Sequence, residues 1–536
     1  MKWRITSLFF LFGILYLSLI FNIYRLQIEK GDFYLARAEF LRRLSGVFQT
    51  PRGAIYLTDR NNNSNIAAFN KDYPVIYAVP KEIQENNNSN NNNNDNNNTR
   101  NYAEKLSTIL NVSVEELEKK FNKPNDEYEI LIQKAGVEQV EKVKNLNLKG
   151  IYIDSQLLRF YPFGGLASHL LGFTANGDEG GGRYGAELYF DKSLNNGENL
   201  VLTIDRVIQG QAEEILKNLI DRYQAVGGTV IVQEPKTGKI LAMGSFPNFD
   251  PNDYSKFKVE NFLNPAVQLV YEPGSVFKVI TMAAGIDSGK ITPETTYIDT
   301  GSVTFNGMTI KNWDLKAHGQ QTMTGVIEQS INTGAVFAQR KIGQDIFYNY
   351  LIKFGFNEST NIVLPGEVRG KINNLKQGKD IDFATASFGQ GVSVTPIELI
   401  SAISAIANDG VLMKPIISGS EKSQVVRRVI SSETSKKVAQ MMVSAVDKNK
   451  IAVISNYSIA GKTGTAFVPD FGKNGYTDEV INTYMGFAPA FDPKFVILIK
   501  LDKPKGSPLA GQTVVPAFRE LAQFILNYYN IAPDRL

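Results

Sequence analysis

The chain has 536 residues, more than one typical domain, so two or three domains with separate cores are expected. Its 57 basic and 54 acidic residues leave a net charge of +3, which gives no reason to expect nucleic acid as a partner. The absence of cysteine excludes disulfides, thiolate metal sites and cysteine nucleophiles, and two histidines, His169 and His318, are fewer than a catalytic zinc site usually needs. His169 lies in an apolar segment and His318 in a polar turn, so a serine enzyme here would be better served by a lysine base.

The N-terminus predicts a membrane anchor. Residues 1–4 include Lys2 and Arg4, and residues 5–24 (ITSLFFLFGILYLSLIFNIY) carry no charge over a length that spans a bilayer as a helix. A cleaved signal peptide would have a shorter apolar core that ends in small residues, and FNIYRLQIEK offers no such site. We therefore expect a short cytoplasmic N-terminus at 1–4, a transmembrane helix at 5–24 and the rest of the chain outside the membrane.

Residues 25–195 have a mixed helix and strand pattern. RGAIYLTDRN (52–61) predicts a strand that ends in a turn, and AEKLSTILNVSVEELEKKF (103–121) predicts helix, turn and helix, with Ser113 as a cap ahead of Glu116. Between them, ENNNSNNNNNDNNNTR (85–100) is a polar tract that cannot bury enough apolar surface to fold. We expect a disordered loop there.

From residue 196 the pattern becomes that of a second domain. Residues 203–223 predict an amphipathic helix, and the alternation on both sides of EPKTG within 227–246 predicts a β-hairpin. Near the C-terminus, IAGKTGTAF, YMGFAPAF and FVILIKLD are three more strand candidates, and AFRELAQFILNYY predicts a closing helix. Two early and three late strands around mainly helical sequence predict one antiparallel five-stranded sheet flanked by helices, in a mixed α+β domain at 196–536.

Ser275 and Lys278, in YEPGSVFK (271–278), follow a Pro-Gly break at a spacing of three. Both side chains would project from one face of a helical turn, where a lysine amine could take the proton of the serine hydroxyl. Glu272, Pro273, Gly274 and Ser275 are also ordinary residues for the start of the apolar helix that follows. Alone, Ser-x-x-Lys is a weak pattern in a long chain.

Two further polar groups follow in the order of a known signature. QSINTG contains Ser330 and Asn332, and GKTGTA contains Lys462, Thr463, Gly464 and Thr465. Each group alone fits a helix boundary or an edge strand. The ordered set Ser-x-x-Lys, Ser-x-Asn and Lys-Thr-Gly is typical of β-lactamases and penicillin-binding proteins. The sequence resembles a class B penicillin-binding protein, a monofunctional peptidoglycan D,D-transpeptidase.

The resemblance covers nearly the whole chain. PRGAIYLTDRN, RFYPFGGLASHLLGF and YGAELYFDKSL resemble the pedestal region of that family, and SFGQGVSVTPIEL resembles its transpeptidase domain. Asparagines after DRN and the inserted asparagine tract depart from the family pattern. The resemblance implies a penicillin-binding-protein/β-lactamase-like transpeptidase domain at 196–536, on an elongated α+β pedestal of the dimerisation type at 25–195, with no glycosyltransferase domain.

The family also implies roles for the catalytic residues. Ser275 would attack the carbonyl between the two terminal D-alanines of a stem peptide, release D-alanine and form an acyl-enzyme. Lys278 would be the base, which requires a pKa lowered by burial and by nearby positive charge such as that of Lys462. Ser330 would relay the proton to the leaving amine, and Asn332 would hold substrate amides or the lysine.

The Lys-Thr-Gly segment is expected to bind the substrate. Backbone N–H groups of Ser275 and Thr465 would form the oxyanion hole, and Gly464 would permit close approach of the strand edge. The hydroxyls of Thr463 and Thr465 would bind the terminal carboxylate. Penicillin resembles D-Ala-D-Ala, so stable acylation of Ser275 is expected. No metal or cofactor is implied.

The expected partners are stem peptides, β-lactams as inhibitors, the membrane, a membrane glycosyltransferase, and division or elongation proteins. YEPGS and the short C-terminus favour the division type. The expected location is the bacterial cytoplasmic (inner) membrane, single-pass, with the catalytic domain on the outer side. The alternatives are a D,D-carboxypeptidase or β-lactamase-like hydrolase, a β-lactam sensor on the same fold, and a purely structural division protein.

Overall fold

The structure is a computed structural model of the 536-residue chain, and it describes residues 51–535 apart from 90–94, 124–125, 127, 176–180, 306, 471, 473–474 and 507–508. Before residue 51 it describes only 3, 12–13, 16–21 and 23–24. In this described part, no helix has both the length and the apolar character needed to cross a membrane. The predicted anchor at 5–24 lies largely outside the described residues, so it stays a prediction.

The chain forms two compact units. The first contains residues 1–52 and 70–160, and the second contains residues 53–69 and 161–536. The expected boundary at 195 therefore differs from the division in the structure, because β1 (Ile55–Thr58) pairs in parallel with β7 (Leu200–Asp205) and so belongs with the later part of the chain. Strand β2 (Asn65–Ala78) contributes residues to both units.

The first unit has helices packed on a small sheet. Its elements are α3 (Pro80–Ser89), α4 (Asp95–Leu110), α5 (Val114–Phe121), β3 (Glu129–Ile132), α6 (Val137–Leu146) and β4 (Ile151–Phe160), with the later residues of β2. Strands β3 and β4 both pair with β2. The buried core includes Leu106, Leu117 and Phe121. Ser113 accepts a hydrogen bond from Glu116 N at 3.2 Å, which confirms the predicted cap of α5.

The asparagine tract is more ordered than expected at both ends. Helix α3 continues to Ser89 and α4 begins at Asp95, so only residues 90–94 of the predicted loop at 85–100 remain, and they lie outside the described residues. The backbone is thus helical at both ends of the tract in the structure, and the disordered loop stays a prediction. Asparagine costs a helix only about 0.7 kcal/mol per residue relative to alanine, and the buried Ile83 and Ala103 anchor the two helices on the core.

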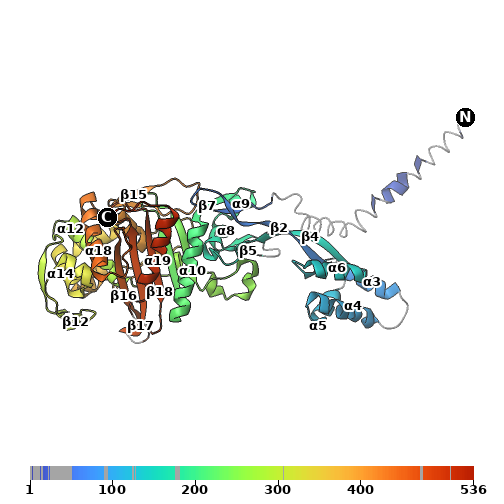
Figure 1. The fold of residues 1–536 in the computed structure, drawn as a ribbon. Coiled ribbons are helices and arrows are strands. Elements are labelled where there is room, and N and C mark those ends of the chain that lie inside the picture. Colours follow the sequence, from blue (N-terminus) through green and yellow to red (C-terminus); the bar gives the residue numbers. More distant parts are fainter. Residues whose placement is uncertain are drawn as a thin grey trace. The chain divides into compact units, whose positions relative to one another are not determined.

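The second unit contains the predicted five-stranded sheet. Strands β8 (Gly227–Gln233) and β9 (Ile240–Phe246) form the expected hairpin, and β16 (Ala460–Asp470), β17 (Gly475–Ala488) and β18 (Phe495–Asp502) are the three late strands. The order is β16-β17-β18-β8-β9, and every neighbouring pair is antiparallel. Strand β16, which carries Lys462, lies at one edge of this sheet (Figure 1).

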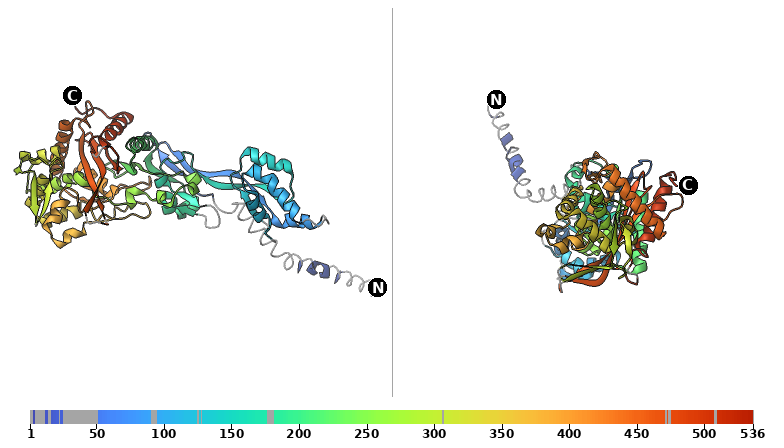
Figure 2. Two further views of the ribbon diagram at one scale, coloured as in Figure 1. Left: turned by 90° about the horizontal axis from the view of Figure 1, so that it is seen from below. Right: turned by 90° about the vertical axis from the view of Figure 1, so that its left-hand side faces the viewer.

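Helices cover both faces of the sheet, so its central strands are apolar on both sides. Val230 and Val232 pack in one core with α10 (Arg206–Tyr223) and α19 (Val514–Tyr528). Ile231 packs in the other core, with α12 (Lys278–Asp287), α17 (Pro396–Ala407) and α18 (Ser432–Asn449). This alternation follows the two-residue period of a strand. Figure 2 shows the sheet and these helices from two further directions.

The remaining elements of the second unit complete the surroundings of α12. Those that precede it are α7 (Ser168–Leu171), β5 (Phe173–Ala175), β6 (Gly181–Arg183), α8 (Gly185–Tyr189), α9 (Asp191–Asn195), η2 (Pro251–Lys256), η3 (Val259–Phe262), α11 (Pro265–Gln268) and η4 (Gly274–Phe277). Those that follow it are β10 (Thr296–Asp299), β11 (Ser302–Phe305), β12 (Met308–Lys311), β13 (Gly319–Thr322), α13 (Met323–Gln329), α14 (Asn332–Ile342), α15 (Gln344–Lys353), η5 (Asn373–Gln377), α16 (Asp380–Ala386), β14 (Val411–Met413) and β15 (Val425–Arg428).

Candidate active site

Ser275 lies in the short 3₁₀ helix η4, and Lys278 is the first residue of the buried helix α12. The residue that caps η4 is Pro273 and the one that caps α12 is Phe277, and neither cap makes a side-chain hydrogen bond. Ser275 is therefore not the cap of the following helix, which removes the plainer explanation of this serine. Ser275 is partly exposed, whereas Lys278 is fully buried.

The FGQGV segment holds the turn that carries Ser275. Gly274 N donates to Gly389 O at 3.0 Å, and Gly391 N donates to the Glu272 carboxylate at 3.1 Å. Gly389 has φ +80°, and a Cβ there would lie 2.2 Å from Gly274 O, so only glycine permits this approach. This segment, part of the SFGQGVSVTPIEL run that resembles the family's transpeptidase domain, thus supports the backbone next to the candidate nucleophile.

The Lys278 amine lies among acceptors from the Ser-x-Asn segment. Its Nζ donates to Ser330 O at 2.6 Å, to Ser330 Oγ at 3.2 Å and to Asn332 Oδ1 at 2.8 Å. Ser330 ends α13 in the left-handed region, with φ 57°, which turns both of its oxygens toward the amine. Strain of this kind in a residue other than glycine is common at functional sites.

Lys462 brings a second amine to the same serine. Its Nζ donates to Ser330 Oγ at 2.9 Å, to Thr463 O at 3.0 Å and to Thr463 Oγ1 at 3.3 Å. Ser330 Oγ therefore lies between the two lysine amines. This places a hydroxyl that can both donate and accept a proton beside each amine.

Both lysines are shifted toward the neutral form. Burial, and second the positive charge of Lys462, hold the pKa of Lys278 well below its usual value. Burial lowers the pKa of Lys462 to about 7. A pKa lowered in this way makes a buried amine a candidate proton acceptor, because burial and a like charge both favour its neutral form.

The edge strand β16 runs close to the turn of Ser275. A Cβ on Gly464 would lie 2.8 Å from Pro273 O and 3.1 Å from Val276 Cγ1, so the strand approaches η4 at van der Waals distance. Thr465 Oγ1 donates to Asn482 Oδ1 at 3.2 Å on the neighbouring strand. The structure therefore brings the Ser-x-x-Lys, Ser-x-Asn and Lys-Thr-Gly segments together from η4 and α12, from the α13–α14 junction and from β16.

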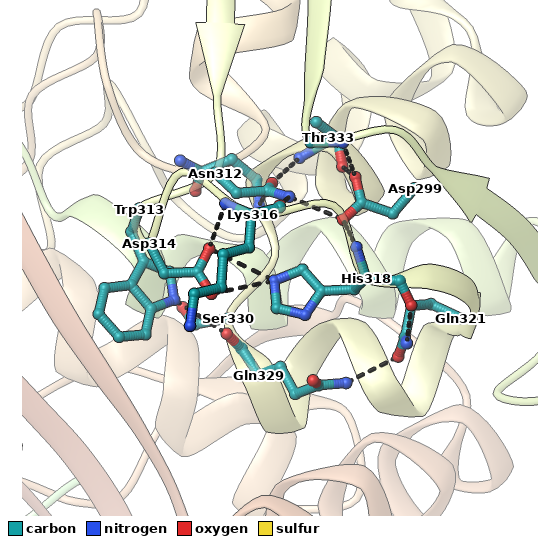
Figure 3. Close-up of polar contacts among 12 residues, drawn as sticks. Asp299, Asn312, Trp313, Asp314, Lys316, His318, Gln321, Gln329, Ser330 and Thr333 are labelled. Carbon is teal, nitrogen blue, oxygen red and sulfur yellow. Dashed lines mark hydrogen bonds and ion pairs between the residues drawn. The ribbon is translucent and has the colours of Figure 1, made fainter.

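The two histidines lie elsewhere. His169 is buried, contacts Asn261 O at 3.0 Å through Nε2, and has a pKa lowered to about 4 by burial. His318 contacts Asp314 in the loop after β12 (Figure 3). In the part of the chain that the structure describes, no cluster of histidine and carboxylate side chains could hold a metal ion.

Sequence reasoning missed two residues behind the site. Asn312 accepts a hydrogen bond from the backbone N–H of Asn332. It also donates to Asp299 (Figure 3). Neither belongs to a motif, and they lie 20 and 33 positions before Asn332. Only the pairing of β10 with β13 and of β11 with β12 brings them there. No spacing in the sequence could have indicated them.

A five-stranded sheet with a serine turn, two buried lysines and a Lys-Thr-Gly edge strand defines the class of serine acyltransferases that form penicillin adducts. The chain belongs to the penicillin-binding protein transpeptidase family: residues 228–523 match the penicillin binding protein transpeptidase domain, and residues 48–242 match the penicillin-binding protein dimerisation domain. The resemblance to a class B penicillin-binding protein is thereby confirmed.

Relatives match over most of the chain. Stage V sporulation protein D of Bacillus subtilis is 32% identical over 526 residues, which cover 90% of this chain and 78% of that protein. Peptidoglycan D,D-transpeptidase FtsI of Escherichia coli is 28% identical over 570 residues, with 100% and 93% covered. A solved peptidoglycan synthetase from Bifidobacterium adolescentis has a TM-score of 0.69 and 27% identity, and the match covers 91% of this chain and 97% of that one.

Proposed function

We propose that this protein cross-links peptidoglycan stem peptides as a D,D-transpeptidase that works through an acyl-enzyme on Ser275. One observation carries the proposal. Three residues after a partly exposed serine, the fully buried amine of Lys278 lies within 2.6–3.2 Å of Ser330 and Asn332, and Lys462 contacts the same Ser330 hydroxyl. A serine nucleophile is activated by an adjacent base, and a buried amine with a lowered pKa, three residues from Ser275, supports Lys278 in that role.

In acylation, the neutral amine of Lys278 accepts the hydroxyl proton of Ser275 as its oxygen bonds to the carbonyl carbon between the terminal D-alanines. The bond from that carbon to the nitrogen of the last D-alanine then breaks, and the leaving amine takes the proton held by Lys278 through the Ser330 hydroxyl, so Lys278 is neutral again. The amine of a second stem peptide attacks the resulting ester in the reverse sequence. Its proton passes back through Lys278, Ser275 is regenerated, and the new amide is the cross-link.

The Lys-Thr-Gly strand serves binding and charge stabilisation in this proposal. Because β16 is an edge strand, alternate backbone N–H groups point away from β17, and Thr465 N with Ser275 N can stabilise the tetrahedral oxyanion. Thr463 and Thr465 hydroxyls bind the substrate carboxylate, and Lys462 adds positive charge nearby. A β-lactam enters the same site and leaves Ser275 acylated.

The protein is proposed to act at the outer side of the bacterial cytoplasmic membrane, held by an anchor at 5–24. The uncharged run of twenty residues there supports this location. Its partners are proposed to be a membrane glycosyltransferase, which would supply glycan strands, and proteins of the division machinery rather than of elongation, in line with YEPGS and the similarity to FtsI.

A product assay tests the reaction. The purified protein is incubated with a stem pentapeptide donor and an amine acceptor, and free D-alanine and cross-linked peptide are measured by mass spectrometry. Cross-linked product that is lost with Ser275→Ala supports the transpeptidase. D-alanine release with only hydrolysed donor would indicate a D,D-carboxypeptidase. Penicillin acylation with no turnover of either peptide would indicate a β-lactam sensor.

A further inference from the structure

The helix that carries Asn332 has no cap of its own. Asn332 is the first residue of α14, and the preceding Ile331 has no side-chain acceptor for the free N–H groups at the start of a helix. The acceptor comes instead from Asn312, which directly follows β12. Its Oδ1 accepts from Asn332 N at 3.1 Å and from Thr333 N at 3.2 Å. Asn312 is 1% exposed, so water does not compete for these contacts.

Asp299 fixes the orientation of Asn312. The Asn312 Nδ2 donates to Asp299 Oδ2 at 2.8 Å and to Lys316 O at 2.9 Å, so its oxygen must face α14. Asp299 Oδ1 accepts from the Thr333 hydroxyl at 2.6 Å, which binds the carboxylate directly to the same helix (Figure 3). Burial raises the pKa of Asp299, but hydrogen bonds from Thr333 and from the backbone of Gly301, among others, outweigh it and hold the pKa below its usual value.

The Asn332 side chain is held from the same segment. Its Nδ2 donates to Lys311 O at 2.8 Å, next to Asn312, and its Oδ1 accepts from Lys278 Nζ at 2.8 Å. The backbone and the amide of Asn332 are thus both fixed by residues 311–312. A shift of this segment would move the acceptor that Lys278 contacts.

We infer that Asn312 and Asp299 are positioning residues for acylation: they set Asn332, and through it the amine of Lys278, for proton transfer from Ser275. The inference deepens the proposed function and rests on it. A buried carboxylate and amide that served only stability would need no connection to the site. Here Asn312 contacts both Asn332 and Thr333, the first two residues of α14, and Asp299 contacts Thr333.

The test compares penicillin acylation by wild type, Asn312→Ala, Asn332→Ala and the double variant. For Asn312→Ala, we expect the acylation rate constant at saturating penicillin to fall about tenfold or more, since small misplacements at a reacting centre cost up to about 10²-fold. The dissociation constant of the preceding complex should change less than about threefold, because Asn312 is buried. In the Asn332→Ala background, Asn312→Ala should lower the acylation rate constant by only about twofold or less, because Asn312 is inferred to act through Asn332.

Asp205→Ala is the matched control. Asp205 caps α10 and accepts from Val207 N and Ile208 N at 2.9 and 3.1 Å, as Asn312 does for α14, but it contacts no residue of the site in the described structure. It should lower the melting temperature, because a helix cap is lost, and leave the acylation rate constant within about twofold. Should Asn312→Ala not fold, the isosteric Asp299→Asn tests the same network and is expected to change acylation in the same direction.

A wild-type rate in folded Asn312→Ala, or a loss that persists in full without Asn332, would overturn the inference. A wild-type protein that penicillin does not acylate would instead overturn the proposed function, so the two failures are distinct.

Discussion

Replacing Lys278 with arginine tests whether Lys278 acts as a proton acceptor or only as a positive charge. The Lys278 amine is fully buried, with three acceptor atoms within 3.2 Å of Nζ, and the lowered pKa makes its neutral form available. An arginine side chain is similar in length to lysine, and its guanidinium can donate hydrogen bonds to the same acceptors. It cannot lose a proton at working pH, because its pKa exceeds about 12. It would also keep a permanent positive charge beside Lys462.

Loss of a general base typically slows a reaction by about 10²–10⁴-fold, which corresponds to about 3–5 kcal/mol of transition-state stabilisation. We expect a fall of this size in the second-order rate constant of penicillin acylation for Lys278→Arg. The rate is measured with a fluorescent penicillin in excess, and a thermal melt verifies folding. Lys500→Arg is the control, because Lys500 is also a buried lysine, 6% exposed, on β18 of the same sheet.

If Lys278 only paired with its acceptors or oriented Asn332, arginine would keep a sizeable part of the rate. Acylation by folded Lys278→Arg within about threefold of wild type would therefore refute the assignment of Lys278 as the base. The role would then move to Lys462, the other amine that contacts Ser330.

Three further predictions follow from the same geometry. Lys462→Met removes the positive charge that helps to lower the pKa of Lys278, so that pKa should rise and the acid limb of the pH–rate profile for acylation should move to higher pH. An acid limb at the wild-type pH would argue against an effect of the Lys462 charge on Lys278. Burial raises the pKa of Glu272 from 4.5 to about 7, so the stability from its neutral carboxyl is present below pH 4.5 and is lost as pH rises through 7. The melting temperature of Glu272→Gln should therefore exceed that of wild type by a difference that grows from pH 5 to pH 8. A constant difference would contradict the raised pKa of Glu272. Gly464→Ala places a Cβ 2.8 Å from Pro273 O and should slow acylation about tenfold or more, whereas Gly210→Ala, with no atom within 4 Å, should leave it unchanged.

The sequence predicted much of the catalytic fold. Strong alternation and amphipathic periodicity indicated the hairpin at 227–246, the late strands and α10, because both faces of the sheet must be apolar where helices cover them. The edge position of β16 beside η4 was expected only from the family resemblance, through Gly464 and the oxyanion hole, because strand neighbours depend on long-range pairing that the strand pattern does not reveal. The division between the two units in the structure likewise depends on long-range pairing, because the parallel pair β1–β7 joins residues about 145 apart.

The candidate site was found where motifs exist and missed where they do not. Ser275, Ser330 and Lys462 were named from spacing and order, and the structure brings their three segments together. Asn312 could not be named, because a buried asparagine that caps another helix has no local sequence pattern. The ends of the asparagine tract show a different limit of the sequence: composition describes what a segment can bury by itself, whereas α3 and α4 extend into the tract from residues that are packed in the core.

The most direct test of the account is the mass and location of the penicillin adduct. Intact-mass measurement of the wild-type protein after incubation with benzylpenicillin should show one added penicillin per chain, and peptide mapping should place it on the peptide that contains Ser275. Ser275→Ala, with an unchanged thermal melt, should show no adduct. An adduct on a residue other than Ser275, or one that persists in Ser275→Ala, would contradict the central claim that Ser275 is the nucleophile.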